Sequence, residues 1–309
     1  MREFAWDEYV NLGVINAIEV VREVSETDKI NTLGYCLGGI ILTTAALVLQ
    51  QKKLDYINSM GHMTVMLDHA VPGDISYFID KELLALETAQ KFGGGIMSGK
   101  IIAQTFSALR ANEMIWSYWI NNYLLGKTPD AFDILYWNND SADLPVLMHE
   151  FLLKRLYLGN ELVHGKLVID GIKMQLTKLA LPTYIFAAQK DHIVPWQSAF
   201  KSLKYLHGPL RFVLGASGHT AGVVNPVSAN KRNYWVNDDI TATAEDWFLQ
   251  AKEISGSWWK DYNNWLTQFS GPQKSAPKNQ GNVKYKPLMD APGEYVLAKA
   301  MPIPMSSYV

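Results

Sequence analysis

The segment Ile30–Gln50 constrains the fold of this chain more than any other. Ile30–Tyr35 is too short for a helix and has the apolar run of a buried strand, whereas Ile40–Leu49 is long and apolar enough for a packed helix. Between them, Gly34-Tyr35-Cys36-Leu37-Gly38 places a nucleophilic side chain between two glycines. Bulky neighbours would clash with the strand and the helix in so tight a turn, so glycine flanks it. We therefore predict that Cys36 lies on a sharp strand–helix turn.

Two interpretations of Cys36 are open at this point. Free cysteines are commonly small core residues, so Cys36 can be a buried thiol in a glycine-rich turn. Alternatively, the turn is the nucleophile elbow of the α/β-hydrolase fold, with Cys where serine hydrolases have Ser. In that case the helix N-terminus directs N–H groups toward the nucleophile, which favours a thiolate and a developing oxyanion. The backbone N–H of Leu37 is then the predicted oxyanion donor.

Composition excludes several classes of protein. The chain has 309 residues, of which 48% are hydrophobic, and its net charge of −2 gives no indication of nucleic-acid binding. Its single cysteine excludes an intrachain disulfide and a multi-cysteine metal site, and it fits a reducing compartment. The longest apolar run is too short to span a bilayer, and Met1–Val10 lacks the apolar region of a signal peptide.

The order of elements predicts a doubly wound, mostly parallel sheet. Trp6–Val24 has helical apolar spacing, and Met63–Leu67 reads as a strand that ends at Asp68-His69. The sheet resumes at Pro182–Ala188, followed by a helix at Gln197–Leu206 and a strand at Arg211–Leu214. A Trp-rich segment, Thr241–Phe269, is expected to be helical.

We divide the chain into four parts. Residues 1–73 form the core with the elbow, residues 74–165 a mostly helical cap or lid, residues 166–270 the rest of the core, and residues 271–309 a loosely packed tail. The cap is rich in aromatic residues, and Gly93-Gly94-Gly95 is predicted to be its flexible joint.

Two further side chains follow predicted strands. Asp191 comes shortly after Pro182–Ala188, and His219 after Arg211–Leu214. The carboxyl ends of parallel strands lie at one edge of a sheet, so Cys36, Asp191 and His219 are expected to converge. Nucleophile, acid and histidine also occur in the chain order of α/β-hydrolases. We predict that His219 accepts the thiol proton and that Asp191 orients the imidazole.

The remaining histidines are weaker candidates. His192 is an alternative base, although a residue next to the acid usually points away from it. His69 is expected to make a structural hydrogen bond, and four others are expected on the surface or in loops: His62, His149, His164 and His207. No metal-binding motif and no dinucleotide fingerprint is present, so we expect neither a metal nor a bound cofactor.

Six motifs resemble those of the polyhydroxyalkanoate (polyhydroxybutyrate) synthases of the single-subunit type. They are Gly34-Tyr35-Cys36-Leu37-Gly38-Gly39, Asn121-Asn122-Tyr123-Leu124-Leu125-Gly126, Tyr136-Trp137-Asn138-Asn139-Asp140, Asp191-His192-Ile193-Val194-Pro195-Trp196, Phe212–His219 and Lys231-Arg232-Asn233-Tyr234-Trp235. The resemblance implies a Cys36–His219–Asp191 triad that transfers 3-hydroxyacyl groups, such as 3-hydroxybutyryl, from coenzyme A onto a polyester. It also implies a covalent acyl-cysteine, a homodimer and a location at polyester granules in the cytoplasm.

The same resemblance implies that an N-terminal region, the first strands of the sheet and the loop with the second oxyanion donor are missing here. Since losing one such donor typically costs about two to three orders of magnitude in rate, we expect a truncated, weakly active form. Two alternatives stay open. One is a Cys-dependent thioesterase or polymer depolymerase on the same fold, and the other is an inactive granule-binding fragment.

Overall fold

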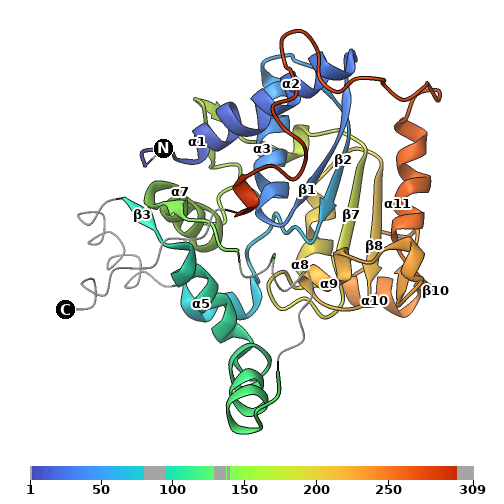
Figure 1. The fold of residues 1–309 in the computed structure, drawn as a ribbon. Helices are drawn as coiled ribbons and strands as arrows, with labels where there is room; N and C mark the ends of the chain where they lie inside the picture. The colour runs from blue at the N-terminus through green and yellow to red at the C-terminus, as the bar shows by residue number, and fades with distance from the viewer. Residues whose placement is uncertain (1, 80–94, 129–136, 138–139, 298–309) are drawn as a thin grey trace.

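A six-stranded sheet forms the centre of the computed structural model, which describes residues 2–79, 95–128, 137 and 140–297 (Figure 1). The strand order is β1-β2-β7-β8-β9-β10. The first four strands are parallel, and β9 runs antiparallel to both β8 and β10. The strands are β1 (Ile30–Tyr35), β2 (Ile57–Met63), β7 (Thr183–Ala188), β8 (Leu210–Gly215), β9 (Asn233–Val236) and β10 (Lys252–Ser255). This arrangement confirms the predicted mostly parallel α/β sheet, and β1 forms one edge of it.

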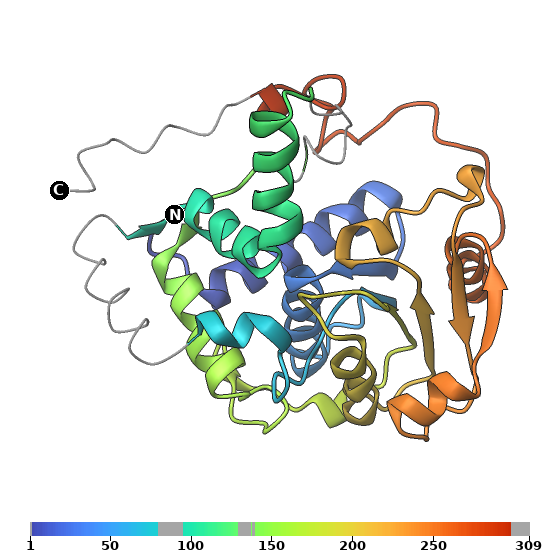
Figure 2. The ribbon, with the colours of Figure 1, turned by 90° about the horizontal axis from the view of Figure 1, so that it is seen from below.

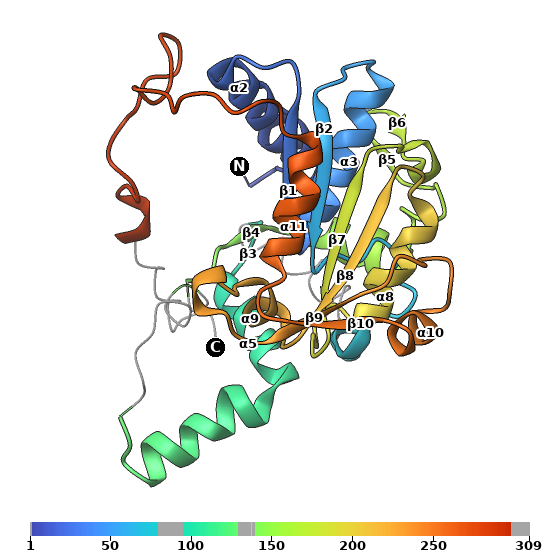
Figure 3. The same ribbon diagram turned by 90° about the vertical axis from the view of Figure 1, so that its right-hand side faces the viewer.

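Helices cover both faces of the sheet (Figure 3). One face packs against α3 (Leu37–Gln51), α8 (Trp196–Lys201) with η8 (Ser202–Tyr205), and α10 (Ala244–Leu249). The N-terminal helical stretch joins this cluster, as α1 (Trp6–Glu8), η1 (Tyr9–Ile15) and α2 (Asn16–Ser25). The other face packs against α9 (His219–Val223) and α11 (Trp259–Leu266). Helix α3 is buried from Gly39 to Leu49, which accounts for its nearly uniform apolar sequence.

The described part of the predicted cap is mostly helical, as expected (Figure 2). Its elements are η2 (Gly73–Phe78), β3 (Ile96–Met97), α5 (Gly99–Leu109), η4 (Asn112–Trp116), η5 (Trp119–Leu124), β4 (Leu144–Pro145), α7 (Val146–Phe151) and η6 (Leu152–Leu158). The run from α5 to η5 extends away from the sheet as an arm (Figures 1 and 3) and exposes large apolar side chains such as Trp116, Trp119 and Tyr123. Gly93 and Gly94 of the predicted joint lie outside the described residues.

Short elements complete the fold. They are β5 (Val168–Ile169), β6 (Ile172–Lys173), η7 (Leu176–Lys178), η9 (Val227–Ala229), η10 (Thr267–Phe269) and η11 (Tyr295–Leu297). Between Gly271 and Leu297 the chain is largely exposed and without regular structure apart from η11. In the described ranges, no helix has both the length and the apolar character needed to cross a membrane.

Two predicted elements are wrong. The strand placed at Met63–Leu67 instead ends at Met63, and the buried residues after it form an irregular loop. Polar residues within β2 interrupt its apolar pattern, so the strand is not recognisable in the sequence. In the structure these polar side chains are hydrogen-bonded. For example, Ser59 Oγ donates to Asn31 Oδ1 at 2.8 Å. The segment Thr241–Phe269 is not continuously helical, because β10 separates α10 from α11 and closes the edge of the sheet.

Candidate active site

Cys36 occupies a strained backbone position between β1 and α3. Its φ and ψ are 51° and −127°, a conformation that residues other than glycine rarely adopt. Two hydrogen bonds hold the turn. The Cys36 N–H donates to the Met63 carbonyl at 3.0 Å, and its carbonyl accepts from the Gly39 N–H at 2.9 Å. The thiol is partly exposed. The predicted sharp strand–nucleophile–helix turn is therefore present.

Close packing explains two of the glycines at this turn. A Cβ atom on Gly34 would lie 2.4 Å from the Gly39 Cα, and one on Gly39 would lie 2.3 Å from Val65 Cγ2. Real Cβ contacts are not this short, so strand, turn and helix approach one another only because these side chains are absent. By contrast, a Cβ on Gly38 would have no neighbour within 4 Å. The steric requirement thus falls on Gly34 and Gly39 rather than on Gly38.

The N-terminus of α3 lies directly behind the thiol. Leu37 is the first residue of this 15-residue helix, and Cys36 is its N-cap. The first N–H groups of a helix have no carbonyl partner within it, and they carry the positive end of the helix dipole. This position favours negative charge on the sulfur and on an oxygen bound next to it.

The ring of His219 is fixed by Asp191. The imidazole Nδ1 lies 2.7 Å from Asp191 Oδ2, and the Asp191 side chain is 0% exposed. Asp191 Oδ1 accepts the backbone N–H groups of Ile193 and Val194 at 2.8 and 2.9 Å. Because a carboxylate only accepts, Nδ1 carries the proton and Nε2 is the nitrogen left for another partner.

Electrostatics link His219 to Cys36. Burial lowers the pKa of the ring, but hydrogen bonding to Asp191 and to Cys36, together with the negative charge of both groups, outweighs burial and raises the pKa of His219 to about 10. The raised pKa makes the ring a strong acceptor for the thiol proton of Cys36. Tyr35 packs against it, with ring centroids 5.2 Å apart.

Four other histidines take no part in the hydrogen bond between His219 and Asp191. His192 is half-buried, and the hydrogen bonds of the Asp191 carboxylate go to His219, Ile193 and Val194 rather than to its ring. His164 and His207 are exposed in loops, as expected. His62, predicted at the surface or in a loop, instead lies buried in β2 with Nε2 2.9 Å from Thr43 Oγ1.

Two histidine predictions near Cys36 are also wrong. His149 is not a surface or loop residue, because it sits half-buried on α7 in the wall of a cavity. His69 does not make the expected structural hydrogen bond, since neither ring nitrogen has a partner among the described residues. The position of both depends on how the cap lies over the core, which the strand and helix patterns do not encode. The one hint in the sequence is that Asp68-His69 ends the buried apolar run Val65–Leu67 in the loop after β2.

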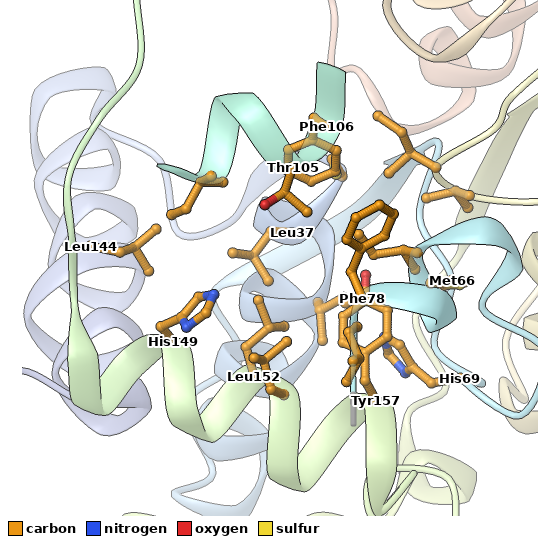
Figure 4. A pocket seen from close by; sticks show the side chains of 18 of the residues that line it. Leu37, Met66, His69, Phe78, Thr105, Phe106, Leu144, His149, Leu152 and Tyr157 are labelled. Atoms are coloured by element: carbon orange, nitrogen blue, oxygen red, sulfur yellow. The ribbon is translucent and has the colours of Figure 1, made fainter. Parts of the chain in front are cut away.

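Cys36 opens onto an apolar cavity of about 310 Å³ (Figure 4). The cavity lies between the core and the described part of the cap. Its walls come from α3, the loop after β2, η2, α5 and the α7–η6 stretch, together with Ile193 and Val194. His69 and Tyr157 lie beside each other toward one end, and Leu144 and His149 toward the other (Figure 4). Among the residues that the structure describes, no three His, Cys, Asp or Glu side chains gather into a metal site.

Comparisons with known proteins agree with this geometry. A family model described as alpha/beta hydrolase fold matches residues 2–226. The chain is 44% identical over 301 residues to the poly(3-hydroxyalkanoate) polymerase subunit PhaC of Cupriavidus necator, covering 96% of this chain and 51% of that protein. The poly(3-hydroxyalkanoate) polymerase 2 of Ectopseudomonas oleovorans is 37% identical, with 96% and 53% covered. The PhaC subunit of Rhizobium meliloti is 34% identical, with 96% and 48% covered.

These similarities confirm the resemblance to the polyhydroxyalkanoate synthases that the sequence motifs indicate. The chain spans about half the length of the curated relatives that it matches.

Proposed function

This chain belongs to the alpha/beta hydrolase fold family, and on that premise we propose that it is an acyltransferase. Its substrates would be 3-hydroxyacyl thioesters of coenzyme A, such as 3-hydroxybutyryl-coenzyme A, and its product a polyhydroxyalkanoate chain. Two findings support this proposal. Relatives named poly(3-hydroxyalkanoate) polymerase match almost the whole of the chain. In addition, Cys36 stands beside a histidine that is hydrogen-bonded to a buried carboxylate.

In the first step we propose that the Cys36 sulfur attacks the thioester carbonyl. His219 takes the thiol proton on Nε2, while Asp191 holds Nδ1 and stabilises the imidazolium. The tetrahedral intermediate places its oxyanion at the Leu37 N–H and the positive end of α3. When the intermediate collapses, the carbon–sulfur bond to coenzyme A breaks, and His219 returns the proton to the departing thiolate. Coenzyme A is therefore a leaving group and no resident cofactor.

In the second step the acyl group leaves Cys36. The hydroxyl of another 3-hydroxyacyl unit attacks the acyl-Cys36 carbonyl, and His219 accepts the hydroxyl proton. An ester bond forms, the bond to Cys36 breaks, and the proton returns to the sulfur. Each cycle then lengthens the polyester by one unit without any change in oxidation state.

The apolar cavity next to Cys36 supports transfer to a hydroxyl rather than to water. Water competes with the hydroxyl for the acyl-cysteine, so a polymerase must keep it away. The side chains from α5 and η6 that face Cys36 across the cavity are mainly apolar. We accordingly propose that residues 74–165 act as a cap that shields the acyl group.

The observation that carries this proposal is the Asp191–His219 pair beside Cys36, and a product analysis tests it. The protein is incubated with 3-hydroxybutyryl-coenzyme A, and free coenzyme A, soluble 3-hydroxybutyrate and polyester are each measured. We expect release of coenzyme A with formation of polyester, and neither product from Cys36→Ala. Soluble acid in place of polyester would establish a thioesterase instead, and no release at all would contradict an enzymatic function.

A further inference from the structure

His69 is buried in the wall of the Cys36 cavity, and the part of the chain that the structure describes gives its ring nitrogens no hydrogen bond of normal geometry. The residue is 2% exposed, and neither ring nitrogen has a partner among the described residues. A weak hydrogen bond to the Leu67 backbone raises the pKa of the ring against burial, but this contact lies outside normal hydrogen-bond geometry. A neutral imidazole carries one donor and one acceptor, and leaving them unpaired away from water is unfavourable. The protein therefore retains a polar group here that its own described residues do not satisfy.

The loop that carries His69 is held in place by a hydrogen-bond network. The Asp68 carboxylate accepts the side-chain amide of Asn160 at 2.8 Å, the Ala70 N–H at 3.0 Å and the Tyr205 hydroxyl at 2.9 Å. Asn160 Oδ1 in turn accepts the backbone N–H of His69 at 2.9 Å. These bonds fix the backbone on both sides of the ring. The unpaired imidazole is thus a consequence of a well-defined loop.

Tyr157 packs against His69 in the wall of the same cavity. The two rings meet edge to face, with centroids 4.8 Å apart and planes at 65° (Figure 4). Burial raises the pKa of the Tyr157 hydroxyl, and the charge of Cys36 raises it further, so the tyrosine lies within electrostatic range of the thiol. Met66 and Phe78 supply apolar wall on the same side of the cavity as this pair (Figure 4). An acyl chain on Cys36 that enters this part of the cavity meets apolar side chains and one imidazole.

We propose that His69 is a specificity-determining residue that hydrogen-bonds to the oxygen on the third carbon of the acyl group held by Cys36. This inference rests on the proposed acyltransferase function. In a monomer that oxygen is a hydroxyl, which both donates and accepts, and in a growing chain it is an ester oxygen, which only accepts. A neutral imidazole can serve either oxygen with its N–H. An apolar cavity alone distinguishes only weakly between a substrate with a hydroxyl group and one without it. A buried polar group that needs a hydrogen-bond partner discriminates strongly against the substrate that lacks the hydroxyl.

The test compares two thioesters that differ only at this position. Single-turnover release of coenzyme A is measured with 3-hydroxybutyryl-coenzyme A and with butyryl-coenzyme A, which lacks the hydroxyl. The variants are His69→Leu, which removes both polar atoms, and His69→Gln, which retains a donor and an acceptor. His207→Leu, at an exposed histidine outside the cavity, is the matched control. The midpoint of denaturant unfolding is measured for each protein.

We expect His69→Leu to slow release from the hydroxylated thioester by about 10- to 100-fold and release from butyryl-coenzyme A by less than about threefold. His69→Gln should lie between the wild type and His69→Leu, and His207→Leu should change neither rate. The unfolding midpoint of His69→Leu should equal or exceed that of the wild type, because an unpaired polar group has been removed.

Two results would overturn the role of His69 alone. One is an unchanged ratio of the two rates in His69→Leu, and the other is a marked fall in its unfolding midpoint, which would assign the ring a structural role. If the wild type releases coenzyme A from neither thioester, the proposed function itself fails, and the role of His69 fails with it.

Discussion

The Nδ1 atom of His219 lies 2.7 Å from Oδ2 of Asp191, although 28 residues separate them in the chain. Parallel strands make this contact possible. Asp191 follows β7 and His219 follows β8, and these neighbouring strands pair up to Ala188 and Gly215. Both residues therefore lie beyond the C-terminal ends of the parallel strands, on the same side of the sheet as Cys36, which follows β1. The contact fixes the ring, and this hydrogen bond to Asp191 raises the pKa of His219, which makes the ring a stronger base.

The first prediction distinguishes the two histidines near Asp191. His219→Gln should reduce coenzyme A release by about three to four orders of magnitude, because it removes the group that accepts and returns the proton. His192→Gln is the matched substitution and should cost less than about tenfold, since its ring does not bond to the carboxylate. Steady-state rates for both variants are the measurement. A larger loss in His192→Gln would show that the wrong histidine has been assigned.

The second prediction concerns the glycines of the turn. Gly34→Ala should destabilise the protein by at least about 1–3 kcal/mol, because its methyl group would meet the backbone of Gly39, which has no flexible side chain to move aside. Gly38→Ala, four residues further on, enters open space within a helix and should be neutral or stabilising by up to about 1 kcal/mol. Denaturant unfolding measures both. Equal effects at the two positions would contradict the described packing of the turn.

The third prediction concerns acid stability. Burial lowers the pKa of His62 from 6.5 to about 4, so the folded state binds its proton less readily than the unfolded chain. Stability contributed by the neutral ring is therefore complete above pH 6.5 and is lost as the pH falls toward 4, by an amount on the order of 3 kcal/mol.

Burial also lowers the pKa of His69, so its contribution to stability is lost over the same range of falling pH as that of His62. The raised pKa of His219 has the opposite sign, but its contribution changes only between pH 6.5 and about 10 and is constant below that window. Unfolding free energies measured from pH 7 to 4 should show that His62→Gln has a shallower slope than the wild type. Identical slopes would mean that His62 is not buried in its neutral form.

The fourth prediction tests the cap by hydrogen exchange. Helix α3 is almost entirely buried, whereas the stretch from α5 to η5 is largely exposed to solvent. Backbone amides of residues 99–124 should exchange faster than those of Leu37–Gln51. The reason is that a solvent-exposed part of the cap opens locally at a lower free energy than a buried core helix. A long-chain acyl group on Cys36 should slow exchange in α5, which lines the cavity. Equal protection in both regions, with no response to acylation, would make residues 74–165 part of the static core.

A strand or helix of this fold can be predicted from the sequence when its hydrophobic pattern is long and uninterrupted. The strands β1, β7 and β8 and the helix α3 are recognisable because their apolar runs are long or unbroken. Strand β2 is not, since Asn58, Ser59 and His62 interrupt its apolar pattern. These polar side chains are paired in the structure by groups of β1, α3 and η10, which lie far away in the sequence. Towards the far edge, β9 and β10 are only four residues each, and β10 has a single apolar residue, Ile254, so neither has a run long enough to indicate a strand.

For the candidate site, the sequence places the residues that follow strands and misses those that the cap brings in. Cys36, Asp191 and His219 converge because the sheet puts strand ends together. Whether the ring of His69 finds a partner, and whether His149 faces a cavity, is decided by packing between the core and α7–η6. Such contacts join segments far apart in the chain, and no local pattern records them.

The covalent state of Cys36 during turnover tests the central claim most directly. The protein is mixed with 3-hydroxybutyryl-coenzyme A, quenched in acid within the first turnover and examined by intact-protein and peptide mass spectrometry. We predict one added 3-hydroxybutyryl group, located on the peptide that contains Cys36 and absent from Cys36→Ala. Release of coenzyme A at the wild-type rate with no such adduct, or with an adduct on another residue, would contradict the account.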